Sequence, residues 1–65
     1  MTPEELKEGC LYKIHGLSQI GPMIYLGIFV KETTQTKLYG FCLVNKPQDV
    51  KYYRYSEVMD SIREL

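Results

Sequence analysis

The residues of this chain with the most capacity for chemistry are tyrosines that stand beside cations. The segment Lys51–Tyr55 reads KYYRY and holds three of the six tyrosines. Tyrosine gives rigid, amphipathic contact area, and Tyr and Arg are enriched at binding hot spots. Aromatic rings also stack on the bases of single-stranded nucleic acid, where Lys and Arg meet phosphate. The sequence therefore predicts a binding surface at Lys51, Tyr53, Arg54 and Tyr55, although tyrosine is also a good strand former that serves packing.

The chain offers little for catalysis. His15 is the only histidine, and no serine or cysteine stands with it in a recognisable nucleophile motif. The carboxylates do not pair for general acid–base work, and no glycine-rich phosphate loop occurs. No CxxC motif or Cys/His cluster supplies metal ligands. We therefore expect no enzyme: no catalytic residue, no metal and no cofactor.

Size, charge and cysteine content narrow the class of protein. The 65 residues fit one small domain, residues 1–65. The formal net charge is zero, whereas proteins that grip duplex phosphates carry a basic excess. Cys10 and Cys42 could pair, but small, reduced core residues are the favoured interpretation. Because no apolar stretch of about 18 residues and no leader is present, we expect a cytoplasmic protein without a membrane span.

Two apolar runs, Met23–Val30 and Leu38–Val44, lie either side of the polar turn Glu32–Lys37 and predict a β-hairpin. If Glu32 opposes Lys37, alternate side chains share the face that forms the core: Ile24, Leu26, Ile28, Val30, Tyr39, Phe41 and Leu43. The other face is apolar too, with the Phe29 ring across from bare Gly40. A surplus apolar face is rare in a soluble monomer, so a homodimer is expected, paired through that face or through an edge strand. Its predicted contacts are Tyr25, Phe29, Leu38, Cys42 and Val44.

The ends of the chain supply the remaining elements. Thr2, Pro3 and Glu5 predict a short N-terminal helix with a capping box, which Gly9 ends. Residues 10–14 alternate as a first strand, and residues 16–22 form a loop. Two apolar residues of that loop, Leu17 and Ile20, either tuck under the sheet or stay exposed.

The second half of the chain predicts a turn, a strand and a helix. Residues 46–49 read as a turn with Pro47, and residues 50–55 as a fourth strand that could lie at a sheet edge. Ser56 caps a C-terminal helix. Its apolar residues fall on one stripe that covers the open face or an end of the sheet: Val58, Met59, Ile62 and Leu65.

Short turns and twisted strands in so short a chain favour a small curled barrel over a flat sheet. The segments Gly9–Ile14 (GCLYKI) and Tyr25–Val30 (YLGIFV) resemble the opening of small SH3-like barrels, and the chain also looks like short accessory proteins of bacteriophages. The resemblance covers residues 9–55. We therefore expect a mainly β (α+β) fold: a four-stranded antiparallel SH3-like barrel or twisted sheet with a helix at each end.

Two functions remain in competition, and an enzyme ranks third. Zero net charge, tyrosine enrichment and the surplus apolar face favour a module that docks on a host or partner protein and modulates or inhibits it. The cations beside the tyrosines keep open the binding of single-stranded nucleic acid or of a nucleotide-derived small molecule. The net charge discriminates between the two functions: because the chain has no excess of basic residues, a protein partner is favoured over nucleic acid.

Overall fold

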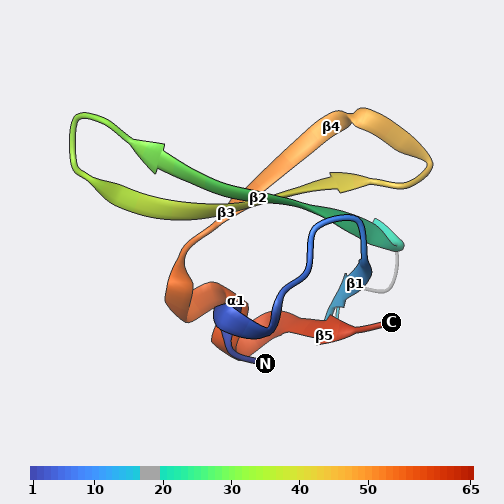
Figure 1. The fold of residues 1–65 in the computed structure, drawn as a ribbon. Coiled ribbons are helices and arrows are strands. Elements are labelled where there is room, and N and C mark those ends of the chain that lie inside the picture. Colours follow the sequence, from blue (N-terminus) through green and yellow to red (C-terminus); the bar gives the residue numbers. More distant parts are fainter. Residues whose placement is uncertain (17–19) are drawn as a thin grey trace.

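The computed structural model describes residues 1–16 and 20–65, which form one antiparallel sheet with helical segments on a single side (Figure 1). The strand order is β4-β3-β2-β1-β5. The mainly β prediction is confirmed, but the sheet has five strands instead of four and stays open instead of closing into a barrel. The elements are η1 (Pro3–Glu5), β1 (Leu11–Ile14), β2 (Met23–Lys31), β3 (Thr36–Leu43), β4 (Lys46–Tyr53), α1 (Tyr55–Ser61) and β5 (Ile62–Glu64).

The fifth strand replaces the second half of the predicted C-terminal helix. α1 begins at Tyr55, before the predicted cap, and ends at Ser61, after which Ile62 is extended at φ −85° and ψ 133°. β5 then pairs with the free edge of β1, with Ile14 opposite Ile62. That pairing satisfies backbone groups of β1 that would otherwise lack a partner. Val58 and Ile62 are buried as the stripe predicted, whereas Met59 and Leu65 are exposed.

The N-terminal helix is a single 3-10 turn. The predicted capping box is present, since the backbone N–H and the hydroxyl of Thr2 both donate to Glu5 Oε1, at 2.9 and 2.8 Å. These hydrogen bonds, the backbone one first, hold the pKa of the exposed Glu5 carboxyl below its ordinary value. The helix ends at Glu5, with the extended Leu6 as its C-cap, before Gly9, so the two predicted turns are reduced to one.

A β-bulge corrects the predicted faces of β2. Tyr25 lies opposite Phe41 and Gly27 opposite Gly40, so Leu26 is an extra residue that reverses the alternation. Met23 and Tyr25 therefore occupy the core positions that were predicted for Ile24 and Leu26.

The turn between β2 and β3 corrects the predicted register. It spans Glu32–Gln35, and Gln35 takes a left-handed φ of +56°. Val30 consequently lies opposite Lys37, two residues away from the predicted pairing of Glu32 with Lys37. A shift of two residues preserves the faces, so Phe29, Leu38 and Gly40 share one face as predicted.

β4 is an edge strand, as predicted, but it starts earlier than expected. The turn that precedes it is the two-residue link Val44–Asn45, so Lys46 is already paired with Leu43. Pro47 belongs to the strand and not to a turn. An edge strand tolerates proline because one row of its backbone N–H groups faces solvent.

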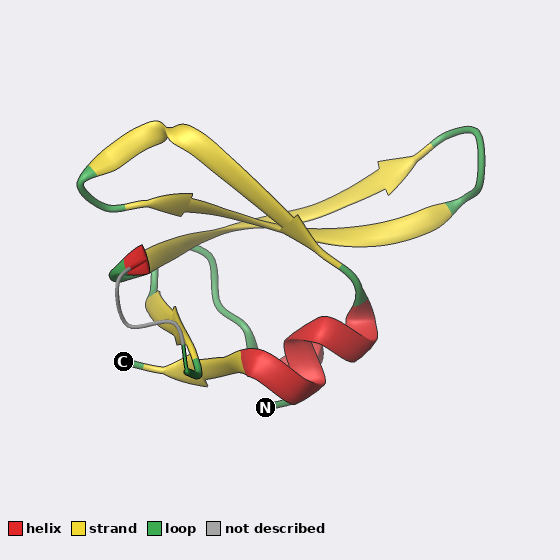
Figure 2. Cartoon of the chain, turned by 180° about the vertical axis from the view of Figure 1, so that it is seen from behind, coloured by secondary structure: helices red, strands yellow, loops and turns green. Residues whose placement is uncertain are grey.

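The core lies between the sheet and the segments beneath it. Its buried residues are Tyr12, Ile14, Met23, Tyr25, Tyr39, Phe41, Val58 and Ile62. η1 and α1 lie on this inner side, the β1–β5 end of the sheet curls beneath β2–β4, and no helix covers the outer side in the described residues (Figure 2). Ile20 packs against the core, whereas Leu17 lies outside the described residues. Both thiols are free, and Cys10 is exposed, so only Cys42 fits its predicted burial.

Candidate functional site

The hairpin of β2 and β3 extends beyond the rest of the sheet as a two-stranded arm, residues 28–38 (Figure 1). β1 pairs with β2 only at Met23 and Ile24, and the pairing of β4 with β3 begins at Tyr39. Over the arm itself, neither strand has a second neighbour among residues 1–16 and 20–65. An isolated hairpin is at best marginally stable in water, so this arm depends on the sheet at its root.

The underside of the arm (Ile28, Val30 and the nearby Tyr55) carries exposed apolar side chains, and the exposed Lys37, opposite Val30, lies on the same side. Ile28 lies directly opposite Tyr39, a core residue, so Ile28 and Val30 occupy inward positions of the sheet. They are nevertheless 54% and 52% exposed, because the inner segments do not reach beneath them. Tyr55 stands at the root of the arm, with its ring centroid 6.3 Å from that of Tyr39. Its hydroxyl donates to Glu4 Oε1 at 3.0 Å, and this hydrogen bond raises the pKa of Tyr55.

The outer side of the arm root carries an aromatic pair, Phe29 and Tyr52. The two ring centroids lie 5.3 Å apart, with the ring planes at 86°. Both rings lean over Gly40, where a Cβ atom would stand 2.5 Å from Cε1 of Phe29 and 3.5 Å from Cε1 of Tyr52. Tyr52 is 51% exposed and Phe29 43%, so both present ring surface to solvent.

A hollow of about 450 Å³ lies at the arm, and we call it the cationic hollow; neither ring of the aromatic pair lines it, but Leu38, the direct partner of Phe29, does. Its lining residues are Lys31, Thr34, Thr36, Leu38 and Arg54. The Oγ1 atoms of Thr34 and Thr36 are 2.8 Å apart, so one hydroxyl donates to the other and one hydroxyl hydrogen remains available. The one ion pair among the described residues joins Lys51 to Asp49, which leaves both cations of the hollow without a carboxylate within 4.0 Å.

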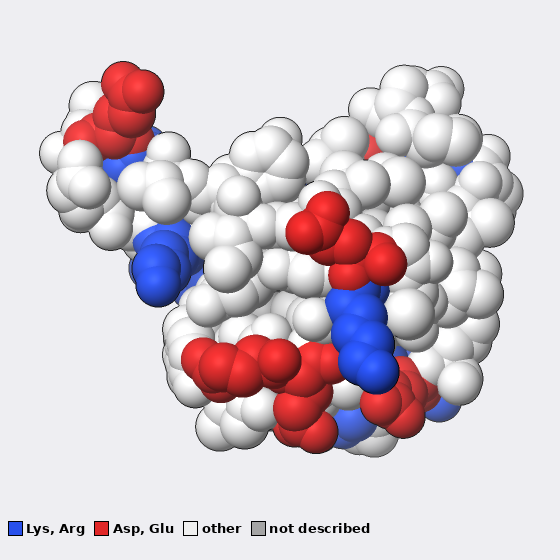
Figure 3. Space-filling view, in the orientation of Figure 1, with Lys and Arg blue, Asp and Glu red and all other residues white. Residues whose placement is uncertain are grey.

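Charge is distributed unevenly over the molecule. Acidic side chains gather over the lower part of the face in Figure 3, where η1, α1 and β5 lie, with basic side chains among them; on the arm, acidic atoms stand at the tip and basic atoms lie below them. The Glu57 carboxylate accepts the Arg54 backbone N–H at 2.8 Å and does not line the hollow. Residues 28–38 of the arm hold Lys31 and Lys37 but a single carboxylate, that of Glu32, in a chain whose net charge is zero.

The four predicted binding residues do not form one surface. Lys51 lies opposite Phe41 and Tyr53 opposite Tyr39, so both lie on the inner side of the sheet. The Tyr53 ring packs 5.7 Å from that of Phe41, and burial, followed by the nearby Glu57, raises the pKa of Tyr53. Arg54 lines the outer hollow, and Tyr55 begins α1 on the inner side.

The five residues predicted for self-association are also divided. Tyr25 is only 5% exposed and belongs to the core, because the bulge turns it inward; its assignment to the open face is wrong. Cys42 is on the outer side but buried between Ile24 and Val50, its neighbours on the adjacent strands. Phe29 and Val44 are exposed and Leu38 is half-buried, so these three remain accessible.

Sequence reasoning missed Lys31, Ile28 and Val30 as site residues. One signal could have found Lys31: it follows Phe29 by two residues, just as Arg54 follows Tyr52. Residues two apart on a strand point to the same face, so each aromatic residue is accompanied by a cation.

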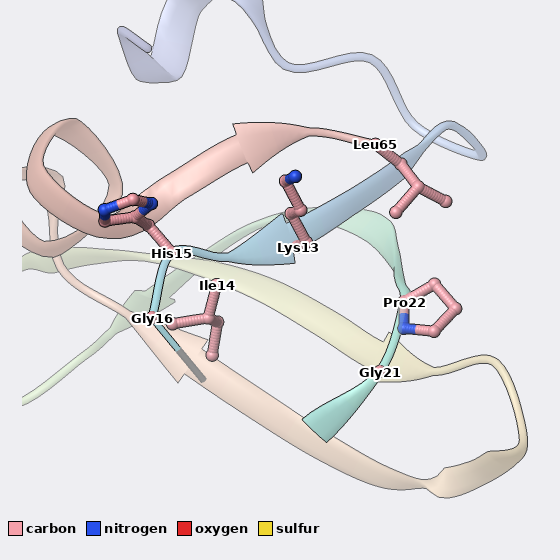
Figure 4. Close-up of a pocket in the computed structure, with 7 residues that line it drawn as sticks. All are labelled: Lys13, Ile14, His15, Gly16, Gly21, Pro22 and Leu65. Carbon is pink, nitrogen blue, oxygen red and sulfur yellow. The ribbon is translucent and has the colours of Figure 1, made fainter. Parts of the chain in front are cut away.

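A second hollow, of about 310 Å³, is lined by Lys13 and His15, but no carboxylate, hydroxyl or thiol side chain of the described residues lines it with them (Figure 4). The side chains of Lys13 and His15 point to one side of β1, whereas Ile14 points to the other. Pro22 and Leu65 complete much of the remaining wall. The imidazole is exposed in a turn, and the His15 backbone N–H donates to the carbonyl of Ser61 at 2.7 Å.

No metal site or membrane-spanning helix was found in the described part of the chain, and no similar protein was found for it. In residues 1–16 and 20–65, no group of three or more His, Cys, Asp and Glu side chains could hold a metal ion. Neither helical segment of that part of the chain has the length and apolar character needed to cross a membrane. Comparisons with protein-family models, with curated proteins and with solved structures found no match to this chain.

Proposed function

We propose that this chain is a small, non-enzymatic binding module that docks on a partner protein through the underside of its arm. The observation that carries the proposal is the exposure of Ile28 and Val30, at 54% and 52%, in positions that face the core elsewhere in the sheet. Complete burial of an isoleucine or valine side chain stabilises by about 1.5–3 kcal/mol. Covering the exposed half of each would contribute roughly 1 kcal/mol per residue to docking.

The backbone of the arm supports the same proposal. No strand of the described part of the chain pairs with either long edge of the arm, so the outward N–H and C=O groups of these edges can pair with an added strand. An extended segment of a partner can add to such an edge while its side chains contact the underside of the arm. Tyr55, a residue type favoured at interfaces, borders the same surface.

The kind of partner and the effect of docking are also part of the proposal. The resemblance of residues 9–55 to small SH3-like barrels and to phage accessory proteins makes a cytoplasmic host protein the proposed partner. Docking would modulate or inhibit that protein by covering part of its surface.

Quantitative capture from a host lysate tests protein docking. The baits are the wild-type chain, the double variant Ile28→Ser/Val30→Ser, and Leu65→Ser, which changes a 64% exposed apolar residue away from the arm. We expect one partner to be retained by wild type and Leu65→Ser and lost by the double variant. Circular dichroism checks that all three baits are folded. Equal capture by the folded double variant would contradict docking at the arm.

Binding of single-stranded nucleic acid or a nucleotide-derived molecule is the second candidate. The outer aromatic pair favours it, since two exposed rings stand beside two cations that have no carboxylate partner within 4.0 Å. Stacking of a base on an aromatic side chain contributes about 1–3 kcal/mol. This candidate uses the side of the sheet opposite to the proposed protein-docking surface.

A further inference from the structure

We infer that the outer side of the arm root is a nucleotide-binding site, with the phosphate in the cationic hollow and the base on the Phe29–Tyr52 pair. This inference deepens the second candidate function and does not depend on protein docking beneath the arm. The ligand is a base joined to a phosphate, and two sources could supply it: a free mononucleotide, or one residue of a single-stranded nucleic acid.

Strand direction brings the required groups together. β2 and β4 are both antiparallel to the intervening β3, so they run parallel to each other. Moving two residues along either strand is therefore a step of about 7 Å in the same direction. Phe29 lies opposite Leu38 and Tyr52 opposite Gly40, so the two residues are staggered by one such step. The step from Tyr52 therefore brings Arg54 to the level of Phe29, and a further step reaches Lys31, which also lines the hollow.

The backbone at Arg54 keeps this geometry beyond β4. Arg54 is extended, at φ −80° and ψ 167°, so its side chain continues the outward alternation of Tyr52. Its backbone N–H is occupied by Glu57 Oε1 at 2.8 Å, which fixes the residue at the junction of strand and helix. The guanidinium has no hydrogen bond to a described residue and can therefore use its donors on a ligand.

The donors of the hollow match a phosphate group. Arg54 presents a planar fork suited to bidentate binding, and Lys31 adds an ammonium group from the opposite strand. The Thr34–Thr36 hydroxyl pair has one hydrogen to donate. Only two cations line the hollow, which fits one phosphate better than a long run of backbone phosphates.

The neighbouring rings match a base. Tyr52 and Phe29 expose 51% and 43% of their surface on the outer side, which no helix covers in the described part of the chain. Gly40 beneath them has no side chain, so the rings lie close to the sheet and leave their outer surface free. Arg54 lies one strand step from Tyr52, and Lys31 lies one strand step from Phe29, so a single nucleotide can contact a ring and a cation together.

Titration followed by amide NMR tests the site with four probes: adenosine monophosphate, adenosine, inorganic phosphate and a short oligothymidylate. We expect the monophosphate to bind more tightly than adenosine or phosphate, with the largest shifts at Phe29, Lys31, Tyr52 and Arg54. Tighter binding of the oligonucleotide would identify the single strand as the source of the nucleotide, and weaker or equal binding would identify the free nucleotide.

Variants distinguish binding at this site from non-specific attraction between a charged ligand and the protein. Arg54→Gln and Lys31→Gln should each weaken monophosphate binding about tenfold, which is the effect of losing one charge-assisted hydrogen bond. Tyr52→Leu should weaken the monophosphate and leave inorganic phosphate unchanged. Lys46→Gln, at the far end of β4, is the matched charge control and should have no effect. The double variant Ile28→Ser/Val30→Ser should bind the nucleotide normally, which separates this site from the docking surface.

Three results would overturn the inference. The first is no binding of any probe at millimolar concentration. The second is binding that folded Arg54→Gln and Lys31→Gln variants retain. The third is inorganic phosphate binding as tightly as the monophosphate, which would remove the role of the rings.

Discussion

The Phe29 ring occupies the space in which a side chain of Gly40 would stand. A Cβ on Gly40 would lie 2.5 Å from Cε1 and 2.9 Å from Cδ1 of that ring, closer than carbon atoms approach. Phe29 also contacts Tyr52 at a centroid distance of 5.3 Å. The absence of a side chain at one position of β3 thus fixes an aromatic pair formed by its two neighbouring strands.

Replacing Gly40 by alanine should displace the Phe29 ring and destabilise the protein by about 1–3 kcal/mol, the usual effect of overpacking. Urea unfolding of Gly40→Ala, Phe29→Ala and the double variant measures the coupling. If the clash is the cause, the double variant should be more stable than the sum of the single effects predicts. Strictly additive effects would show that the ring does not respond to the new methyl group.

Alkaline pH should destabilise the fold through its inward tyrosines. Burial raises the pKa of Tyr25 and of Tyr53. Above pH about 10, the ordinary tyrosine pKa, the unfolded chain therefore binds fewer protons than the folded one, so stability falls as pH rises. Urea unfolding midpoints from roughly pH 8 to 11 should fall for the wild type and fall less for Tyr53→Phe. Parallel curves for the two proteins would contradict this assignment.

The alternation of apolar residues predicted the faces of the arm, because side chains on a strand have a period of two. The bulge at Leu26 was not predicted, although Gly27 offered a signal, since glycine inside a strand often accompanies a bulge. β5 was not predicted, because the spacing of Val58 and Ile62 is that of a helix. That spacing is real, but the free edge of β1 that draws Ile62 into the sheet is a long-range feature.

Part of the candidate site was accessible to sequence reasoning. Arg54 and Tyr55 were identified from the tyrosine-rich segment, and the structure places them at the arm. Lys31 was missed, because its proximity to Arg54 depends on two strands that run in the same direction on either side of a third. Tyr53 was included because consecutive strand residues face opposite sides, and local sequence does not say which of two tyrosines turns toward the core.

Self-association through the outer side of the sheet is expected at high micromolar concentration. Phe29, Leu38 and Val44 remain accessible there, and no helix of the described chain covers them. Sedimentation should detect a dimer that Phe29→Ser and Val44→Ser weaken and that Leu65→Ser leaves unchanged. A wild-type monomer at these concentrations would end the expectation.

Nucleotide binding and self-association should oppose each other, because both use the Phe29 ring on the outer side. A ligand that binds only the monomer shifts the equilibrium toward it, and the coupling is reciprocal. At a protein concentration where half of the chains are dimeric, saturating adenosine monophosphate should lower the dimer fraction measured by sedimentation. Arg54→Gln should remove this response and still form the dimer, since Arg54 lines the hollow and not the apolar part of the face. A rise in the dimer fraction with nucleotide would instead mean that the second copy completes the site.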